Sequence, residues 1–176
     1  KSIINKKSQN ILRENYSILN DFGLITNSNS KIVVNNKPKI NPPITHLTLF
    51  VSQKCNLKCI YCYGEGGEYG NEGLMNSKIS AEAVDWLISQ SKGKKQLGIS
   101  FFGGEPLLNF SLIKQTVEYA KKQGDKHNKD FEFGITTNAT LLNNDIIDFL
   151  KCYNIIPIIS FDGTKNLQDK QRPFKN

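Results

Sequence analysis

Four short apolar segments rich in β-branched and aromatic residues recur along the chain, and amphipathic helical patterns separate them. The expected strands cover residues 44–52, 97–102, 130–138 and 156–163, and the expected helices start near Ser80, near Ser111 and at Asn143 or Asn144. Strands that alternate with helices at a spacing of about 30 residues favour a parallel sheet with right-handed crossovers. The sequence therefore predicts an α/β fold with four parallel strands and three helices.

The first 43 residues follow a different pattern. Residues 8–26, "SQNILRENYSILNDFGLIT", predict one amphipathic helix that ends at Gly23, because a residue without a Cβ suits a left-handed C-cap. Residues 27–43, "NSNSKIVVNNKPKINPP", predict a linker. We therefore expect a boundary near Pro42, with an N-terminal helix and linker at 1–43 and the α/β part at 44–176.

The charge balance is basic, with 23 Lys and Arg residues against 16 Asp and Glu residues and a formal net charge of +7. The lysines are scattered and form no basic stripe between aromatic residues, so we expect no nucleic-acid partner. No apolar run approaches the ~20 residues that a membrane helix needs, and no membrane partner is expected. Clustered thiols are typical of metal ligands in a reducing compartment, which predicts a cytoplasmic location.

Three of the four cysteines lie within eight residues, in "QKCNLKCIYCYGEGG", at Cys55, Cys59 and Cys62. A disulfide uses two thiols, a structural zinc site takes four ligands, and a [4Fe–4S] cluster normally takes four thiolates. Three thiolates would leave one iron of such a cluster with an open coordination site. An incomplete zinc knuckle is the alternative. Cys152 is expected to be a packed core thiol, and His46 a structural histidine at the far end of its strand.

Each expected strand ends in polar or small residues, and the carboxyl ends of parallel strands meet at one rim. The first strand leads into the cysteine loop, and the others end in Gly103-Gly104-Glu105-Pro106, Thr136-Thr137-Asn138 and Ser160-Phe161-Asp162-Gly163. Glycine lets a ligand approach the backbone, and a carboxylate can hold an ammonium group by charge-assisted hydrogen bonds. We therefore predict a ligand site at this rim.

The spacing Cys55-x-x-x-Cys59-x-x-Cys62, followed by "GGEP", resembles the radical S-adenosylmethionine superfamily. The resemblance implies a [4Fe–4S] cluster on the three cysteines, whose open iron binds S-adenosylmethionine, and a partial TIM-like (βα) barrel. It implies these cofactor contacts: the Tyr61 backbone on adenine; Gly103, Gly104, Glu105 and Pro106 at the methionine amino group; Thr137 and Asn138 beside them; Ser160 and Asp162 toward the carboxylate and ribose. The reduced cluster would then generate a 5′-deoxyadenosyl radical that removes a hydrogen atom from substrate.

The segments "CIYCYGEGGEYGNEGLM", "TTNATLL" and "SFDGTKNLQDKQRPFKN" resemble the branch that modifies peptides and proteins and carries a SPASM extension. Within it, the thioether-forming maturases of cysteine-rich peptides are the most similar, which implies a peptide or protein substrate and a reducing partner such as flavodoxin or ferredoxin. Anaerobic sulfatase maturation, which makes formylglycine, is the alternative. Outside enzymes, the alternative is a structural module that binds zinc or a cluster.

The pattern also departs from that branch. Ala139 stands where glycine usually follows "TTN", and Gln168 stands where sulfatase maturases commonly have histidine. Four strands are fewer than the six βα units of such a barrel, and no further clustered cysteines follow. We therefore expect the N-terminal part of a longer enzyme, without full turnover by itself. The first helix resembles the end of a module that binds the leader of a peptide substrate, and a packing helix on the barrel is the alternative.

Overall fold

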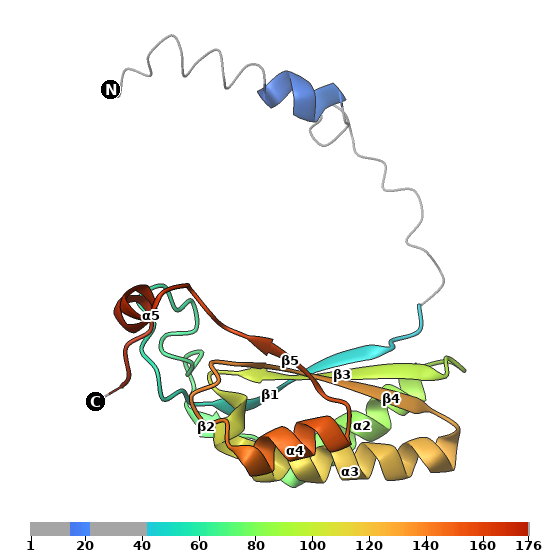
Figure 1. Ribbon diagram of the computed structural model, residues 1–176. Helices are drawn as coiled ribbons and strands as arrows, with labels where there is room; N and C mark the ends of the chain where they lie inside the picture. The colour runs from blue at the N-terminus through green and yellow to red at the C-terminus, as the bar shows by residue number, and fades with distance from the viewer. Residues whose placement is uncertain (1–14, 22–41, 176) are drawn as a thin grey trace. The chain divides into compact units, whose positions relative to one another are not determined.

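The computed structural model describes residues 15–21 and 42–175 of the 176-residue chain (Figure 1). The chain divides into two units, Lys1–Asn41 and Pro42–Asn176. In the first unit a helix covers residues 15–21, inside the range expected from the sequence. The predicted C-cap at Gly23 and most of the predicted linker lie outside the described residues.

The second unit is built on a five-stranded sheet that does not close, in the order β2-β1-β3-β4-β5. Four strands pair in parallel, and only β2 runs antiparallel to its neighbour. The strands are β1 (His46–Gln53), β2 (Gly73–Leu74), β3 (Gln96–Gly103), β4 (Asp130–Thr137) and β5 (Ile156–Ile159). The predicted α/β class and the four predicted parallel strands are confirmed.

Three helices cover one face of this sheet (Figure 1). They are α2 (Ser77–Gln90), α3 (Phe110–His127) and α4 (Asn144–Cys152). A 3-10 helix, η1 (Pro106–Asn109), joins β3 to α3, and α5 (Lys165–Gln171) lies beyond the end of the sheet. Neither β2 nor α5 was predicted, because β2 has two residues and α5 has no buried residue. No helix among the described residues is long and apolar enough to cross a bilayer.

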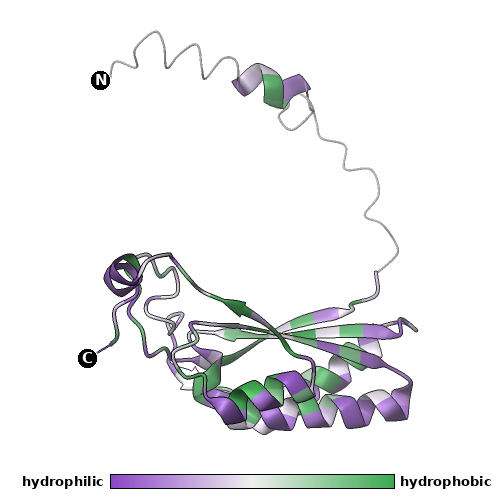
Figure 2. Cartoon of the chain, viewed as in Figure 1, coloured by the Kyte–Doolittle hydropathy of each residue, from purple (hydrophilic) through white to green (hydrophobic). Residues whose placement is uncertain are grey.

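The core lies between the sheet and the three helices. Alternate residues of β1, β3 and β4 are buried, as expected for strands with one covered face: Leu49, Val51, Leu97, Ile99, Phe101, Phe131, Phe133 and Ile135. They pack against buried residues of α2 and α3 such as Val84, Leu87, Ile113 and Val117. Each fully buried side chain of this size stabilises the fold by about 1.5–3 kcal/mol. By contrast, β5 is apolar along its length yet exposed at every residue (Figure 2).

Two helix starts were predicted with different success. Asn143 caps α4, since its side chain accepts a hydrogen bond from the Ile146 backbone N–H at 2.9 Å. The prediction for α2 was wrong, because Asn76 rather than Ser80 is the N-cap and accepts from the Ile79 N–H. Ser80 lies within the helix instead, and its hydroxyl donates to the Ser77 carbonyl oxygen at 3.1 Å.

The prediction for Cys152 was also wrong, because this free thiol is exposed. It is the last residue of α4, whose buried residues are Ile146 and Leu150. Two helical positions beyond Leu150 correspond to about 200° of rotation, which turns Cys152 away from the core. His46 lies at the start of β1, as predicted, and its Nε2 contacts Ser100 Oγ at 2.9 Å.

Candidate functional site

A cavity of about 190 Å³ opens at the carboxyl ends of β1, β3 and β4. It brings together most of the residues singled out in the sequence: Cys55, Cys59, Cys62, Tyr61, Gly103, Gly104, Thr137, Asn138 and Ser160. Three others do not line it: Glu105, Pro106 and Asp162. The parallel topology therefore gathers the three cysteines and three strand ends at one rim.

The three cysteines are free and partly buried. Two donors lie near the sulfur of Cys55, the Leu57 backbone N–H at 3.4 Å and Asn138 Nδ2 at 3.8 Å. Burial raises the pKa of the Cys55 and Cys59 thiols, and hydrogen bonds or neighbouring cations offset only part of that effect. Partly buried thiols of this kind stay protonated at neutral pH unless a metal binds them, because a coordinated thiol is deprotonated outright.

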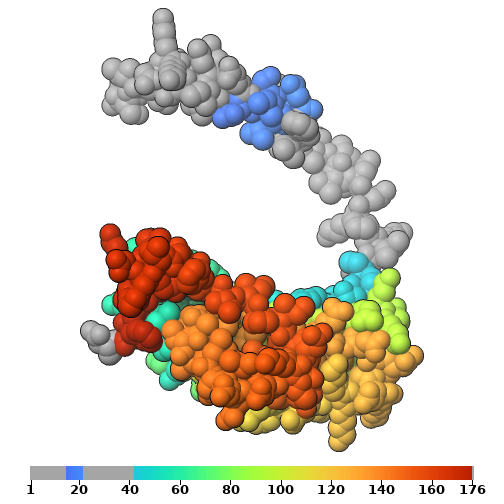
Figure 3. All heavy atoms as spheres, viewed as in Figure 1, coloured from blue at the N-terminus to red at the C-terminus, as the bar shows by residue number. Residues whose placement is uncertain are grey.

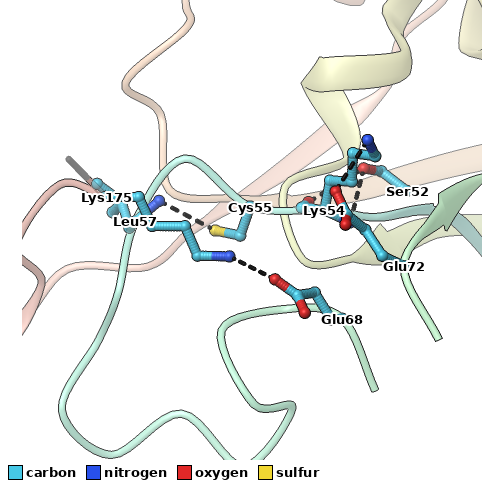
Figure 4. Close-up of polar contacts among 7 residues, drawn as sticks. All are labelled: Ser52, Lys54, Cys55, Leu57, Glu68, Glu72 and Lys175. Carbon is cyan, nitrogen blue, oxygen red and sulfur yellow. Dashed lines mark hydrogen bonds and ion pairs between the residues drawn. The ribbon is translucent and has the colours of Figure 1, made fainter. Parts of the chain in front are cut away.

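Two ion pairs flank Cys55 in the structure (Figure 4). On one side Lys54 Nζ lies 2.9 Å from Glu72 Oε1, and on the other Lys175 Nζ lies 3.0 Å from Glu68 Oε1. Exposed pairs of this kind contribute at most about 1 kcal/mol each. The second pair matters for its position, because it connects Lys175, near the end of the chain, to Glu68 in the loop that follows the cysteines.

Residues 171–175, here called the C-terminal strap, run antiparallel to residues 56–60 of the cysteine loop. Figure 3 shows the red C-terminal residues against the cyan and green residues of this loop. The pairing has an isolated bridge between Leu57 and Phe174. Its backbone hydrogen bonds run from Lys175 N–H to Asn56 O (3.0 Å), from Lys58 N–H to Pro173 O (2.7 Å) and from Ile60 N–H to Gln171 O (2.9 Å). The strap therefore fixes the backbone that carries Cys55 and Cys59.

Gly103 and Gly104 lie where β3 passes the end of β1. A Cβ on Gly103, whose φ is +135°, would lie 2.1 Å from the Ser52 carbonyl oxygen, and one on Gly104 would lie 2.4 Å from that of Lys54. The backbone amides of Gly104 and Glu105 donate to these two oxygens at 2.8 Å. The sequence suggested that these glycines let a ligand approach the backbone. In the structure, the group that lies closest to each missing Cβ is a backbone carbonyl of the chain itself.

Glu105 is fully buried at the centre of this rim. Its Oε1 accepts from the Leu107 N–H (3.0 Å) and the Thr137 hydroxyl (2.8 Å), and its Oε2 accepts from the Asn138 N–H (2.7 Å). Burial raises the pKa of this carboxyl, against the opposing effect of the three hydrogen bonds. Glu105 therefore ties the end of β3 to the end of β4 and starts η1, in which Pro106 is the buried first residue.

The end of β4 turns sharply after Asn138. Ala139 has a φ of +64°, a conformation that glycine adopts at lower cost, and its N–H donates to Thr137 Oγ1 at 3.0 Å. Asn138 itself joins two segments, because its Nδ2 donates to Asn56 Oδ1 at 2.9 Å while its Oδ1 accepts from the Thr140 N–H. The alanine noted in the sequence therefore keeps a turn typical of glycine.

Tyr61, Asp162 and Arg172 form a cluster beside the cavity. Arg172 Nη2 lies 3.0 Å from Asp162 Oδ1, the Tyr61 hydroxyl donates to Asp162 Oδ2, and the guanidinium lies 5.3 Å from the centre of the Tyr61 ring. Burial and the hydrogen bond to Asp162 raise the pKa of Tyr61 to about 12, while the Arg172 hydrogen bond lowers the pKa of Asp162. This cluster connects the β5 end to the cysteine loop.

Sequence reasoning missed several residues of the cavity wall, among them Arg172, Tyr69 and Gly67. Arg172 and Tyr69 line it, and the Tyr69 hydroxyl donates to the Gly103 carbonyl oxygen at 3.3 Å. Gly67 also lines it, where a Cβ would lie 2.6 Å from the Gly104 Cα. The signal for Arg172 was weak, because a single arginine after a polar helix has no distinguishing pattern.

Among residues 15–21 and 42–175, no three His, Cys, Asp or Glu side chains are arranged to hold one metal ion. A [4Fe–4S] cluster imposes a different requirement, since each thiolate binds its own iron. Three ligands of such a cluster therefore need not converge on one point.

Comparison with known proteins matches residues 49–174, more than two thirds of the chain, to the Radical SAM superfamily. An uncharacterized protein of Methanocaldococcus jannaschii is 40% identical over 131 residues, covering 74% of this chain and 43% of that protein. The radical SAM cyclopropyl synthase TigE of Paramaledivibacter caminithermalis is 28% identical over 140 residues, covering 73% and 29%. The cysteine-type anaerobic sulfatase-maturating enzyme of Clostridium novyi is 30% identical over 126 residues, covering 69% and 33%.

Solved structures give the same result. The structure of native anSMEcpe with bound AdoMet has a TM-score of 0.67 at 26% identity, covering 75% of this chain and 36% of that one. The chain thus spans less than half the length of the relatives it matches. Its strand order, its cysteine spacing and the match over residues 49–174 agree. The chain belongs to the radical SAM superfamily, whose enzymes use a [4Fe–4S] cluster and S-adenosylmethionine.

Proposed function

We propose that this chain is the cofactor-binding part of an enzyme that modifies a ribosomally made peptide, by forming a thioether at cysteine residues. The observation that carries the proposal is the cavity in which three free thiols from one loop meet the ends of β3 and β4 and Ser160, which follows β5. This arrangement lies within the region that matches the superfamily.

In this proposal Cys55, Cys59 and Cys62 each bind one iron of a [4Fe–4S] cluster. The fit is supported by the chemistry of the wall, which has three sulfur ligands and a cation, Arg172, whose Nε is buried without a partner among the described residues. The Leu57 and Asn138 donors near Cys55 would stabilise its thiolate. The strap holds the ligand loop in place before the cluster binds.

S-adenosylmethionine would bind in the same cavity, on the surface made by Gly103, Gly104, Thr137, Asn138 and Ser160, with the Tyr61 backbone at the adenine. The cavity is smaller than the 300–1,000 Å³ of typical ligand pockets, so further parts of the enzyme would complete its walls. When bound, the two cofactors supply a radical that abstracts hydrogen from substrate. The chain itself orients them.

Three of the predicted cofactor-binding residues do not line the cavity in the structure: Glu105, Pro106 and Asp162. In this proposal they support the residues that do. Glu105 positions the Asn138 backbone, and Asp162 positions Arg172 and Tyr61. An ionised carboxylate has about four acceptor positions, and the described residues fill three of those on Glu105. That the fourth holds the methionine ammonium stays a prediction.

The peptide substrate is inferred from relatives. A sulfatase-maturating enzyme acts on a protein, and anSMEcpe has been solved with AdoMet and a peptide designated Cp18Cys. We propose that the unit Lys1–Asn41 contributes to binding a leader segment and that flavodoxin or ferredoxin supplies the electron. Formylglycine formation is the second candidate, and the match to the sulfatase-maturating enzymes favours it.

The cofactor proposal is tested by anaerobic reconstitution with iron and sulfide. We expect a brown protein with about four iron atoms per chain, as one [4Fe–4S] cluster requires. A colourless chain that takes up zinc in preference would contradict the cluster. The bond formed is tested by mass spectrometry of a cysteine-containing peptide treated with the full-length enzyme. Thioether closure removes two hydrogens and keeps the sulfur, whereas formylglycine formation loses the sulfur.

A further inference from the structure

The pairing between the strap and the cysteine loop places Arg172 opposite Cys59. The bridge between Leu57 and Phe174 sets the register, and two positions further along it the same register pairs Cys59 with Arg172. The hydrogen bond from Ile60 N–H to the Gln171 oxygen flanks this pair on one side. The bond that would flank it on the other side, from residue 173 to the Lys58 oxygen, cannot form because Pro173 has no N–H. Directly opposed residues on antiparallel strands have Cβ atoms about 4.5–5.5 Å apart, with side chains on the same face.

Arg172 presents its positive charge to the cavity. It lines the cavity together with the three cysteines, whereas its partner Asp162 does not. The side chain of Arg172 is only 14% exposed. The ion pair is therefore oriented, with the Arg172 guanidinium on the side of the thiols and the Asp162 carboxylate on the side away from the cavity. In such a partly buried place the field of a charge is weakly screened by salt and by water.

We propose that Arg172 raises the reduction potential of the cluster held by Cys55, Cys59 and Cys62. This inference rests on the proposed cluster. A 2+ cluster core with three thiolates carries a net charge of −1, and one electron from an external reductant brings it to −2, with no bond formed or broken. A cation beside Cys59 stabilises the −2 state more than the −1 state, so reduction becomes easier. Net charge and hydrogen bonding near the sulfurs are established determinants of such potentials.

The test is a potentiometric titration of the reconstituted chain without S-adenosylmethionine, followed by the electron paramagnetic resonance signal of the reduced cluster. In Arg172→Gln we expect reduction to become less favourable by about tenfold, which corresponds to a potential lower by about 59 mV for one electron. Arg172→Lys keeps the charge and should restore most of the parent potential. Lys58→Gln removes one exposed charge from the same loop and should shift the potential much less.

Asp162→Asn separates the charge effect from loss of structure. It breaks the same ion pair but leaves the cation in place, so we expect a shift to higher potential, opposite in sign to that of Arg172→Gln. If both variants shift in the same direction, the ion pair is only a structural contact and the inference fails. This comparison also decides the matter if Arg172→Gln fails to assemble a cluster, because Asp162→Asn and Arg172→Lys remain measurable.

The two proposals fail in different ways. If the parent chain takes up no cluster, the proposed function falls and this inference with it. If the parent is reduced normally and Arg172→Gln has the same potential, the cluster stands and only the role of Arg172 is refuted. If Lys58→Gln shifts the potential as much as Arg172→Gln, the effect comes from net charge and is not specific to Arg172.

Discussion

Alanine substitutions at four glycines separate two sources of instability. One is a positive φ, which an L-residue adopts at a cost, and the other is a steric clash of the added Cβ. Gly103 combines a φ of +135° with a Cβ position 2.1 Å from the Ser52 oxygen, and Gly104 has only the steric conflict, at 2.4 Å from the Lys54 oxygen. Gly70 has only the positive φ, +75°, and Gly73 has neither, since nothing lies within 4 Å of the added Cβ at either position. The four sites form a complete two-by-two comparison.

The magnitudes follow from the two contributions. A left-handed or similar conformation costs an L-residue roughly 1–2 kcal/mol, and forcing atoms into a packed site costs about 1–3 kcal/mol. The free energy of unfolding should therefore fall by roughly 2–5 kcal/mol in Gly103→Ala, about 1–3 in Gly104→Ala and about 1–2 in Gly70→Ala. Gly73→Ala should be neutral, or stabilising by up to about 1 kcal/mol, because the unfolded chain loses entropy.

The assay is equilibrium urea denaturation followed by circular dichroism. With a slope of about 1–3 kcal/mol per molar urea for a domain of this size, the Gly103→Ala midpoint should move by about 1 M or more. Equal slopes in all four variants would show that the surface exposed on unfolding is unchanged, so the midpoint shifts report changes in stability. If Gly103→Ala is no less stable than Gly70→Ala, β1 does not restrict the rim as described, and the reasoning is refuted.

Two further predictions concern the site. Cys55→Ala, Cys59→Ala and Cys62→Ala should each abolish cluster assembly, whereas Cys152→Ala, at an exposed thiol outside the cavity, should bind iron like the parent; equal iron loss in Cys152→Ala would contradict the three-ligand assignment. Burial raises the pKa of Glu105 above its ordinary value of 4.5, so the folded state holds this proton more tightly than the unfolded chain. The free energy of unfolding should therefore fall as the pH rises from about 4.5 through the raised pKa; urea midpoints between pH 4 and 7 measure this, and an unchanged pH slope in Glu105→Gln would contradict it.

The four parallel strands and their helices could be predicted because alternation and helical periodicity are local patterns that burial reinforces. Residues 97–102 alternate in the sequence as Leu97, Ile99 and Phe101 alternate in burial. The start of α2 was misplaced because Ser80 and Asn76 are both plausible caps, and only the backbone geometry decides between them. Cys152 was misplaced because a helix that ends within one turn of its last core residue can turn a small apolar side chain outward.

The candidate site was predictable to a similar degree. The cysteines, the glycines and the polar strand ends could be found because parallel topology places them at one rim. The strap could not be found, because backbone pairing between residues far apart leaves no periodic pattern in either segment. The buried position of Glu105 was also out of reach, since its partners, Leu107, Thr137 and Asn138, include two backbone amides that carry no sequence signal.

The pairing of residues 56–60 with residues 171–175 also bears on the order of events during synthesis. The two segments lie about 120 residues apart, so the loop that carries the cysteines leaves the ribosome long before the residues that fix it. At about 5–20 residues per second, that interval is roughly 6–24 s. During this time the three cysteines lack the backbone support that residues 171–175 give their loop in the folded chain. We therefore expect the proposed cluster to bind a finished loop only after residue 175 has emerged.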